Sequence, residues 1–98
     1  MKTPEQIKSG LISAKLNQVN AAAEKHAAAL VAYPALAAAD TAARAALHAA
    51  GGFNRAPADI VNAERAARYN REAGERSINS TGAMVRRRER EFHKIHIS

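Results

Sequence analysis

Apolar and small residues recur at steps of four and three along the first third of this chain. The positions are Ile12, Leu16, Val19, Ala23, His26, Leu30 and Tyr33. This spacing places all seven on one narrow stripe of an α-helix, the stripe that a coiled coil or a helical hairpin buries against a neighbouring helix. The strongest pattern in the sequence therefore predicts packing between helices.

Large apolar side chains are scarce. Leu, Ile, Val and Phe together fill 17 of the 98 positions. A share below about 20%, combined with net charge, is common among disordered chains. Alanine fills 25 positions and is the best helix former, so the chain can be helical without a large core. The composition predicts one domain over residues 1–98, with a core so thin that a partner is expected to complete it.

The first helix has a clear start and a clear stop. Thr3 and Gln6 match a capping box, and Pro4 suits the first position of a helix. Pro34 disfavours helical dihedral angles in the residue before it. We therefore expect a helix from residue 4 to about 32.

A second helix is expected over residues 34–50. Gly51 and Gly52 follow it, and glycine commonly stands just past a helix terminus. Its inward face would be Leu36, Ala39, Ala43, Leu47 and Ala50. A tight connection at Pro34 would pack the two helices antiparallel, as a hairpin.

A third helix is expected over residues 57–95. Its stripe is interrupted by one four-residue stutter after Gly74. The stripe reads Ile60, Ala63, Ala67, Asn70, Gly74, then Ile78, Thr81, Val85, Arg88, Phe92 and Ile95. A break in the weak helix formers of Ser77–Gly82 would make four helices instead of three. The predicted fold is all-α: an elongated helical hairpin plus a long third helix, with coiled-coil-like packing.

The charge of the chain is basic, at +6, and arginine is concentrated in the second half. Arginine binds phosphate and carboxylate groups in a bidentate manner. The candidate contacts to phosphate or to an acidic partner are Arg65, Arg68, Arg71, Arg76, Arg86, Arg87, Arg88 and Arg90. The alternative is a solvated helix face with internal ion pairs, because Glu64–Arg68 and Glu72–Arg76 have the favoured i,i+4 order.

Motifs for catalysis or cofactor binding are not found in the sequence. Asp40, Asp59 and Glu64 are interpreted as caps or helix-face charges, and the chain has no cysteine. His93 and His96, with Glu89, would supply half of a metal site, so no metal is expected. His26 is interpreted as a histidine at a helix edge, with a pH-sensitive interface as the alternative.

The uncharged run over residues 27–39 is too short to span a membrane. It resembles the core of a signal peptide, but the leader before it would be unusually long and contains acidic residues. We expect a helix packed by alanine here, and a location in the cytoplasm or in a viral particle rather than secretion.

These observations predict a non-enzymatic structural or adaptor subunit of a larger assembly, such as a small component of a phage virion. Its partners would be copies of itself or other protein subunits, without a small-molecule substrate, a cofactor or a membrane. The alternatives are a small basic regulator that binds nucleic acid and an inhibitor that docks on an acidic protein surface. The predicted helix-packing residues are Ile12, Leu16, Val19, His26, Leu30, Tyr33, Val85, Phe92 and Ile95.

Overall fold

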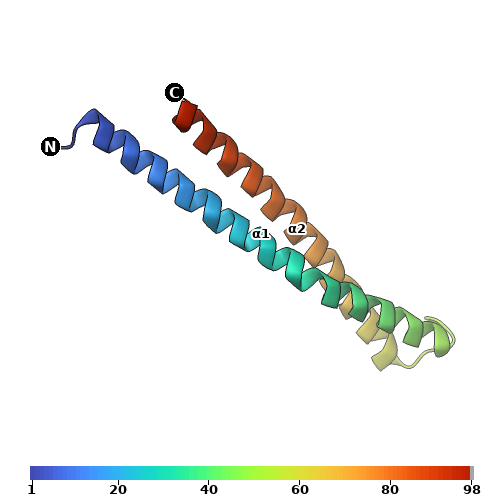
Figure 1. The fold of residues 1–98 in the computed structure, drawn as a ribbon. Coiled ribbons are helices and arrows are strands. Elements are labelled where there is room, and N and C mark those ends of the chain that lie inside the picture. The colour runs from blue at the N-terminus through green and yellow to red at the C-terminus, as the bar shows by residue number, and fades with distance from the viewer. Residues whose placement is uncertain (98) are drawn as a thin grey trace.

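Two long helices make up the computed structural model, which describes the backbone of residues 1–97 and the side chains of residues 1–95. They are α1 (Pro4–Ala49) and α2 (Ala58–Ile97). The helices run antiparallel, so both ends of the chain lie at one end of the hairpin and the loop lies at the other (Figure 1). The molecule measures 73 × 20 × 16 Å. The predicted elongated, all-α fold with an antiparallel hairpin is confirmed. The predicted hairpin turn at Pro34 and the prediction of three helices are wrong, because the hairpin forms between α1 and α2.

The start of α1 is the predicted capping box. The Thr3 hydroxyl accepts a hydrogen bond from the backbone N–H of Gln6 at 3.2 Å. The Gln6 side chain accepts one from the backbone N–H of Thr3 at 2.9 Å. Both donors would otherwise lack a partner inside the helix, so the two bonds stabilise its first turn.

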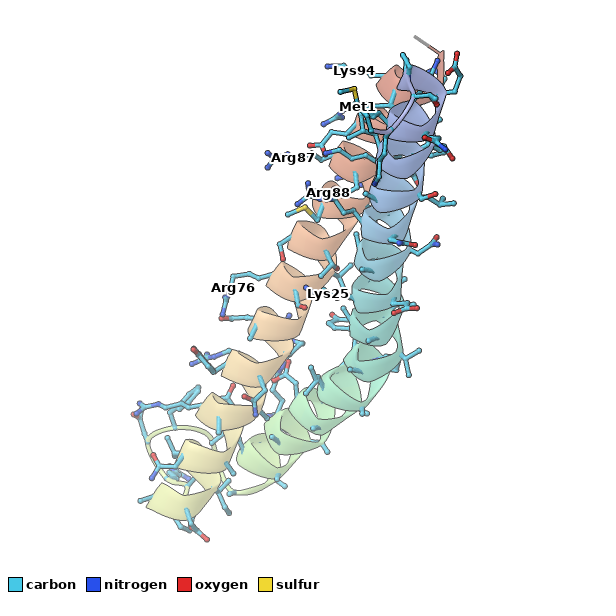
Figure 2. All side chains as sticks on the ribbon, turned by 90° about the vertical axis from the view of Figure 1, so that its left-hand side faces the viewer. Met1, Lys25, Arg76, Arg87, Arg88 and Lys94 are labelled. Atoms are coloured by element: carbon cyan, nitrogen blue, oxygen red, sulfur yellow. The ribbon has the colours of Figure 1, made fainter. Side chains whose placement is uncertain are left out.

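Pro34 lies inside α1, so the helix boundary predicted at this residue is wrong. A proline removes one backbone hydrogen bond and crowds the carbonyl group four residues earlier. Pro34 is on the exposed side of α1, and the opposite side, including Tyr33 and Leu36, packs on α2 near Gly74. Figure 2 shows α1 bending where its colour passes from cyan to green. Packing against α2 therefore carries the helix through the proline, which bends it instead of ending it.

Gly51 and Gly52 end α1, as predicted. Both have a positive φ, at 97° and 86°, which glycine adopts at little cost. The N–H of Gly52 bonds the carbonyl of Leu47 at 3.0 Å, and the N–H of Gly51 bonds the carbonyl of His48 at 3.1 Å. These bonds satisfy carbonyl groups of the last turn and direct the chain into the loop toward α2.

α2 is continuous through Gly74 and through residues 77–82, and its contacts follow one heptad repeat without a stutter. The predicted stripe placed Ala63 and Asn70 in this seam, but both are exposed. Glu64 and Arg71 take their places. The prediction was wrong because these seam positions are charged, and a search for apolar residues passes over them.

The seam of α1 differs from the prediction in the same way. Ile12, Val19, His26 and Tyr33 are half-buried, but the positions between them are Lys15, Ala22 and Ala29 rather than Leu16, Ala23 and Leu30. Further along, the buried residue is Asp40 and not Ala39. A single partner helix covers only one stripe of α1, so the larger leucines one position later stay exposed.

The two helices approach closely at Gly74. A Cβ atom built on Gly74 would lie 2.8 Å from Leu36 Cδ1 and 3.3 Å from Tyr33 Cδ2. A Cβ atom built on Gly10, in contrast, would have no neighbour within 4 Å. The absence of a side chain at Gly74 therefore gives room to the two largest side chains of this part of α1.

Alanine at these two glycines should have opposite effects. Gly10→Ala should raise the free energy of unfolding by up to about 1 kcal/mol, because alanine is the better helix former. Gly74→Ala should lose that gain to crowding, which typically costs about 1–3 kcal/mol. Denaturant unfolding at a fixed protein concentration measures both, and equal stabilisation by the two variants would show that the helices are not in close contact at Gly74.

Candidate functional site

Asp40 is the centre of a polar network that joins the two helices. None of its surface is exposed. Arg44 on α1 and Arg71 on α2 both donate hydrogen bonds to the same carboxylate oxygen of Asp40. Arg71 also donates to Glu75 Oε1 at 2.7 Å, and the Tyr33 hydroxyl donates to that oxygen at 2.8 Å. We call these five side chains the Asp40 network.

The network keeps its acids ionised. Hydrogen bonding from Arg44, and then from Arg71, lowers the pKa of Asp40, although burial acts in the opposite direction. The hydrogen bond from Tyr33, followed by that from Arg71, lowers the pKa of Glu75. The same bond to Glu75 raises the pKa of the Tyr33 hydroxyl. The network therefore holds charged partners together at neutral pH.

Three further polar contacts join the helices toward the open end of the hairpin, and the longest is from Arg88 Nη1 to Gln18 Oε1 at 3.5 Å. Lys15 Nζ lies 3.3 Å from Glu91 Oε2. His26 Nδ1 lies 2.9 Å from Thr81 Oγ1, and this hydroxyl donates to the backbone carbonyl of Ser77 at 2.6 Å. The Thr81 oxygen is thus the acceptor for an N–H on Nδ1 of His26. His26 lies in the seam, half-buried, rather than at the helix edge.

Glu64 is a second buried acid, with 2% of its surface exposed. Its nearest cation is Arg68, with Nη1 3.8 Å from Oε1. Among the described side chains, none forms a hydrogen bond with Glu64 Oε2 or with Asp40 Oδ1. Glu64 borders an open cleft of about 560 Å³ at the loop end, lined by Arg44, Leu47, His48, Gly52, Phe53, Glu64, Arg68 and Arg71.

The outer surfaces of the two helices differ in charge. Seven of the 46 residues of α1 are Asp, Glu, Lys or Arg, against 15 of the 40 residues of α2. Between residues 27 and 49, Arg44 is the only exposed member of this group. Figure 2 shows Arg76 and Arg87 projecting from α2 on the side away from α1. The hairpin therefore has an alanine-rich, nearly uncharged surface on α1 over residues 27–49 and a strongly charged face on α2.

The predicted helix-packing residues fall into two groups. Seven are half-buried between the helices: Ile12, Val19, His26, Tyr33, Val85, Phe92 and Ile95. The other two, Leu16 and Leu30, are 43% and 48% exposed and lie outside the seam. A role for Leu16 and Leu30 in packing therefore requires a partner beyond this hairpin.

The eight arginines predicted to contact phosphate or an acidic partner differ in the contacts they make within the hairpin. Arg71 belongs to the Asp40 network, Arg87 and Arg88 share Glu91, and Arg76 lies over the Tyr69 ring at 5.9 Å. Arg68 is the distant partner of Glu64. Four form no ion pair with the side chains described here: Arg65, Arg76, Arg86 and Arg90. Arg71 and Arg88 are half-buried, so six of the eight predicted arginines are exposed to an outside partner.

Sequence reasoning missed the burial of Asp40 and Glu64, which were interpreted as caps or helix-face charges. The available signal was their spacing. Asp40 follows Tyr33 by seven residues and precedes Leu47 by seven. Glu64 precedes Arg71 by seven residues, and Arg71 precedes Ile78 by seven. Extending the heptads through charged positions would have placed both acids in the seam.

The described residues contain neither a candidate metal site nor a helix suited to span a membrane. No group of three or more His, Asp or Glu side chains suited to a metal ion occurs among the residues whose placement is described, and the His96 side chain lies outside them. Neither helix, over its described length, is apolar enough to cross a membrane. Comparison with protein-family models, with curated proteins and with solved structures finds no match for this chain.

Acid should weaken the hairpin through the Asp40 network. Because the folded pKa of Asp40 lies below the ordinary 3.8, its contribution is complete above that pH and is lost as the pH falls through the folded pKa. Asp40→Asn should therefore lower the melting temperature strongly at pH 7, and the gap from the native chain should narrow at pH 3. Thermal unfolding followed by circular dichroism measures the gap.

The matched control is Asp59→Asn, which removes an exposed carboxylate from the first turn of α2. It should change the free energy of unfolding by no more than about 1 kcal/mol. Two results would contradict a stabilising role for ionised Asp40. One is a loss of melting temperature in Asp40→Asn that is no larger than the loss in Asp59→Asn. The other is a loss in Asp40→Asn that stays constant between pH 7 and pH 3.

Proposed function

We propose that this protein is a non-enzymatic structural or adaptor subunit of a larger assembly, such as a phage particle. It would associate with itself or with other proteins through the outer face of α1. The observation that carries the proposal is the large surface that the hairpin leaves in water.

The exposed surface is much larger than that of a compact monomer. It measures 7050 Å² for a chain of 10.5 kDa. The scaling of surface with mass gives about 5400 Å² for a compact monomer of this size. The excess, roughly 1600 Å² per chain, is comparable to what a whole specific protein–protein interface buries. Association would therefore bring the chain to an ordinary degree of burial.

The interior of the hairpin supports the same proposal. Among the side chains described, only two apolar residues are buried. They are Ala22 and Leu47, and each has 6% of its surface exposed. The other large apolar side chains keep part of their surface in water, and each would gain stability from burial. A chain with so few buried apolar groups gains from a partner what its own core does not supply.

The difference between the two outer faces indicates which side is covered. Charged side chains lose hydration when they are buried, so the charged face of α2 is suited to water or to a charged partner. The nearly uncharged face of α1 has little hydration to lose, and its alanines let another helix approach closely. α1 is therefore the side on which we place the partner.

Thermal stability should depend on protein concentration if the isolated chain assembles with itself. A hundred-fold increase in concentration adds roughly RT ln 100, about 2.7 kcal/mol, to the stability of the assembled state. The melting temperature measured by circular dichroism should therefore rise by several degrees between 1 and 100 µM. A cooperative unfolding transition at the same high temperature across this range would contradict the proposal, because it would show that a single hairpin is stable alone.

A second candidate function is nucleic-acid binding through α2. It is favoured by Arg86 and Arg90, which are exposed, lie one turn apart and have no acidic partner among the described side chains. Arg87 and Arg88, which are engaged with Glu91, would contribute less. Phosphate contacts by the two free arginines would make affinity fall steeply with salt.

Replacing Arg86 and Arg90 together by alanine should flatten the salt dependence of duplex DNA binding by up to about 1.8 in the logarithmic slope. Lys2→Ala with Lys8→Ala removes the same charge from the N-terminal end of the chain, outside α2, and should change the slope less. Fluorescence anisotropy with a labelled duplex measures both. Equal slopes for the two double variants, or no binding at 20 mM salt, would rule out this second candidate.

A further inference from the structure

A second heptad stripe runs along α1 beside the seam. Its members, which we call the outer stripe, succeed each other at steps of four and three and carry no charge: Ser9, Ser13, Leu16, Asn20, Ala23, Ala27, Leu30, Pro34, Ala37 and Thr41. All are exposed except Ala37, which is half-buried. An uncharged stripe with heptad spacing is what a helix presents to another helix.

The outer stripe lies about a quarter of a turn around α1 from the seam, since its positions follow the seam positions by one or four residues. In a four-helix bundle, each helix packs against two neighbours at roughly this angle. The seam of α1 is occupied by α2. The outer stripe is therefore placed to receive the second neighbour of such a bundle.

The geometry points to a second copy of this chain as that neighbour, packed antiparallel on α1 about a two-fold axis near Ala23. This inference rests on the proposed function and identifies the partner. Leu16 and Leu30 each lie seven residues from Ala23, so the antiparallel arrangement brings Leu16 of one copy onto Leu30 of the other. Leu16 and Leu30, two of the three leucines that the hairpin leaves exposed, would then bury each other, with small Ala23 at the axis.

Other surfaces of the chain are less suited to cover this stripe. The outer side of α2 is charged along most of its length, and burying those charges against an uncharged stripe would cost hydration energy. The opposite exposed side of α1 carries Leu11, Gln18 and Ala32, with Lys25 in its middle. The outer stripe of a second copy matches because neither surface brings a charge into the contact.

The size of the contact is adequate for a dimer. Residues 6–40 of α1 would overlap with their counterparts along about 50 Å, at a helix diameter of about 10 Å. The projected contact is therefore roughly 500 Å² on each copy and about 1000 Å² in total, which reaches the lower bound for a specific interface. The excess surface of each chain, roughly 1600 Å², is larger than the share that this contact would bury.

Cysteine cross-linking tests the two-fold arrangement, and the chain has no native cysteine to interfere. The full chain with Ala23→Cys should form a disulfide-linked dimer under mild oxidation, because the two sulfur atoms would meet at the axis. The control, Ala21→Cys, places the thiol on another exposed side of α1 and should stay at least ten-fold less cross-linked. A mixture of the Leu16→Cys and Leu30→Cys chains should give mainly the mixed dimer.

Charge substitution provides a second readout. Leu16→Asp or Leu30→Asp should shift the chain from dimer to monomer in sedimentation velocity, with at least a ten-fold weaker association. Leu11→Asp is the matched control, because Leu11 is also exposed, at 51%, but lies outside the outer stripe. Circular dichroism of each variant under assembling conditions establishes that it is still helical.

The outcomes separate this inference from the proposed function. Association that survives Leu16→Asp, or cross-linking at Ala21→Cys as efficient as at Ala23→Cys, would overturn the two-fold arrangement and leave an assembling subunit. A chain that is poorly helical at every concentration would also overturn it, because the partner would then be a different protein. A stable monomeric hairpin at 100 µM would overturn both.

Discussion

A pair of helices has no interior, and this constraint shapes the whole molecule. Each helix can cover one stripe of the other, so most side chains in the seam are half-buried and only Ala22 and Leu47 are fully buried apolar residues. The length of the helices does not change this, because adding turns adds seam and outer surface in the same proportion. Whatever stability the chain lacks must therefore come from contacts outside the hairpin.

The polar contacts across the seam bear on the register in which two long helices pair. An alanine-rich heptad repeat can pair in several registers of similar energy, since a slip of seven residues replaces one small side chain by another. The Asp40 network, the His26–Thr81 bond and the Lys15–Glu91 pair lie at intervals along the hairpin. A slip would leave Asp40 buried without Arg71, at a large cost in hydration energy. The charged side chains thus select the register, and the apolar ones supply the contact.

Features set by neighbouring residues could be predicted from the sequence, and features set by contacts between the two helices could not. The capping box at Thr3, the glycines after Ala50 and the helical character of both halves were predictable, because each depends on a few neighbouring residues. Pro34 was misleading, since its local preference against helix is overridden by packing with α2. Every second position of the α1 seam was predicted one residue too late, because Leu16 and Leu30 are more apolar than Lys15 and Ala29. Only the pairing with charged partners on α2 shows why the less apolar residues face inward.

In the proposed dimer, the exposed leucines and the uncharged face of α1 have one cause, an incomplete bundle. The most direct measurement is the mass and shape of the full chain in solution, by size-exclusion chromatography with light scattering and small-angle X-ray scattering. The account predicts a particle of twice the 10.5 kDa chain mass whose longest dimension stays near the 73 Å of one hairpin, since the copies pack side by side. A folded particle of 10.5 kDa with the 21.7 Å radius of gyration of the single hairpin would contradict it.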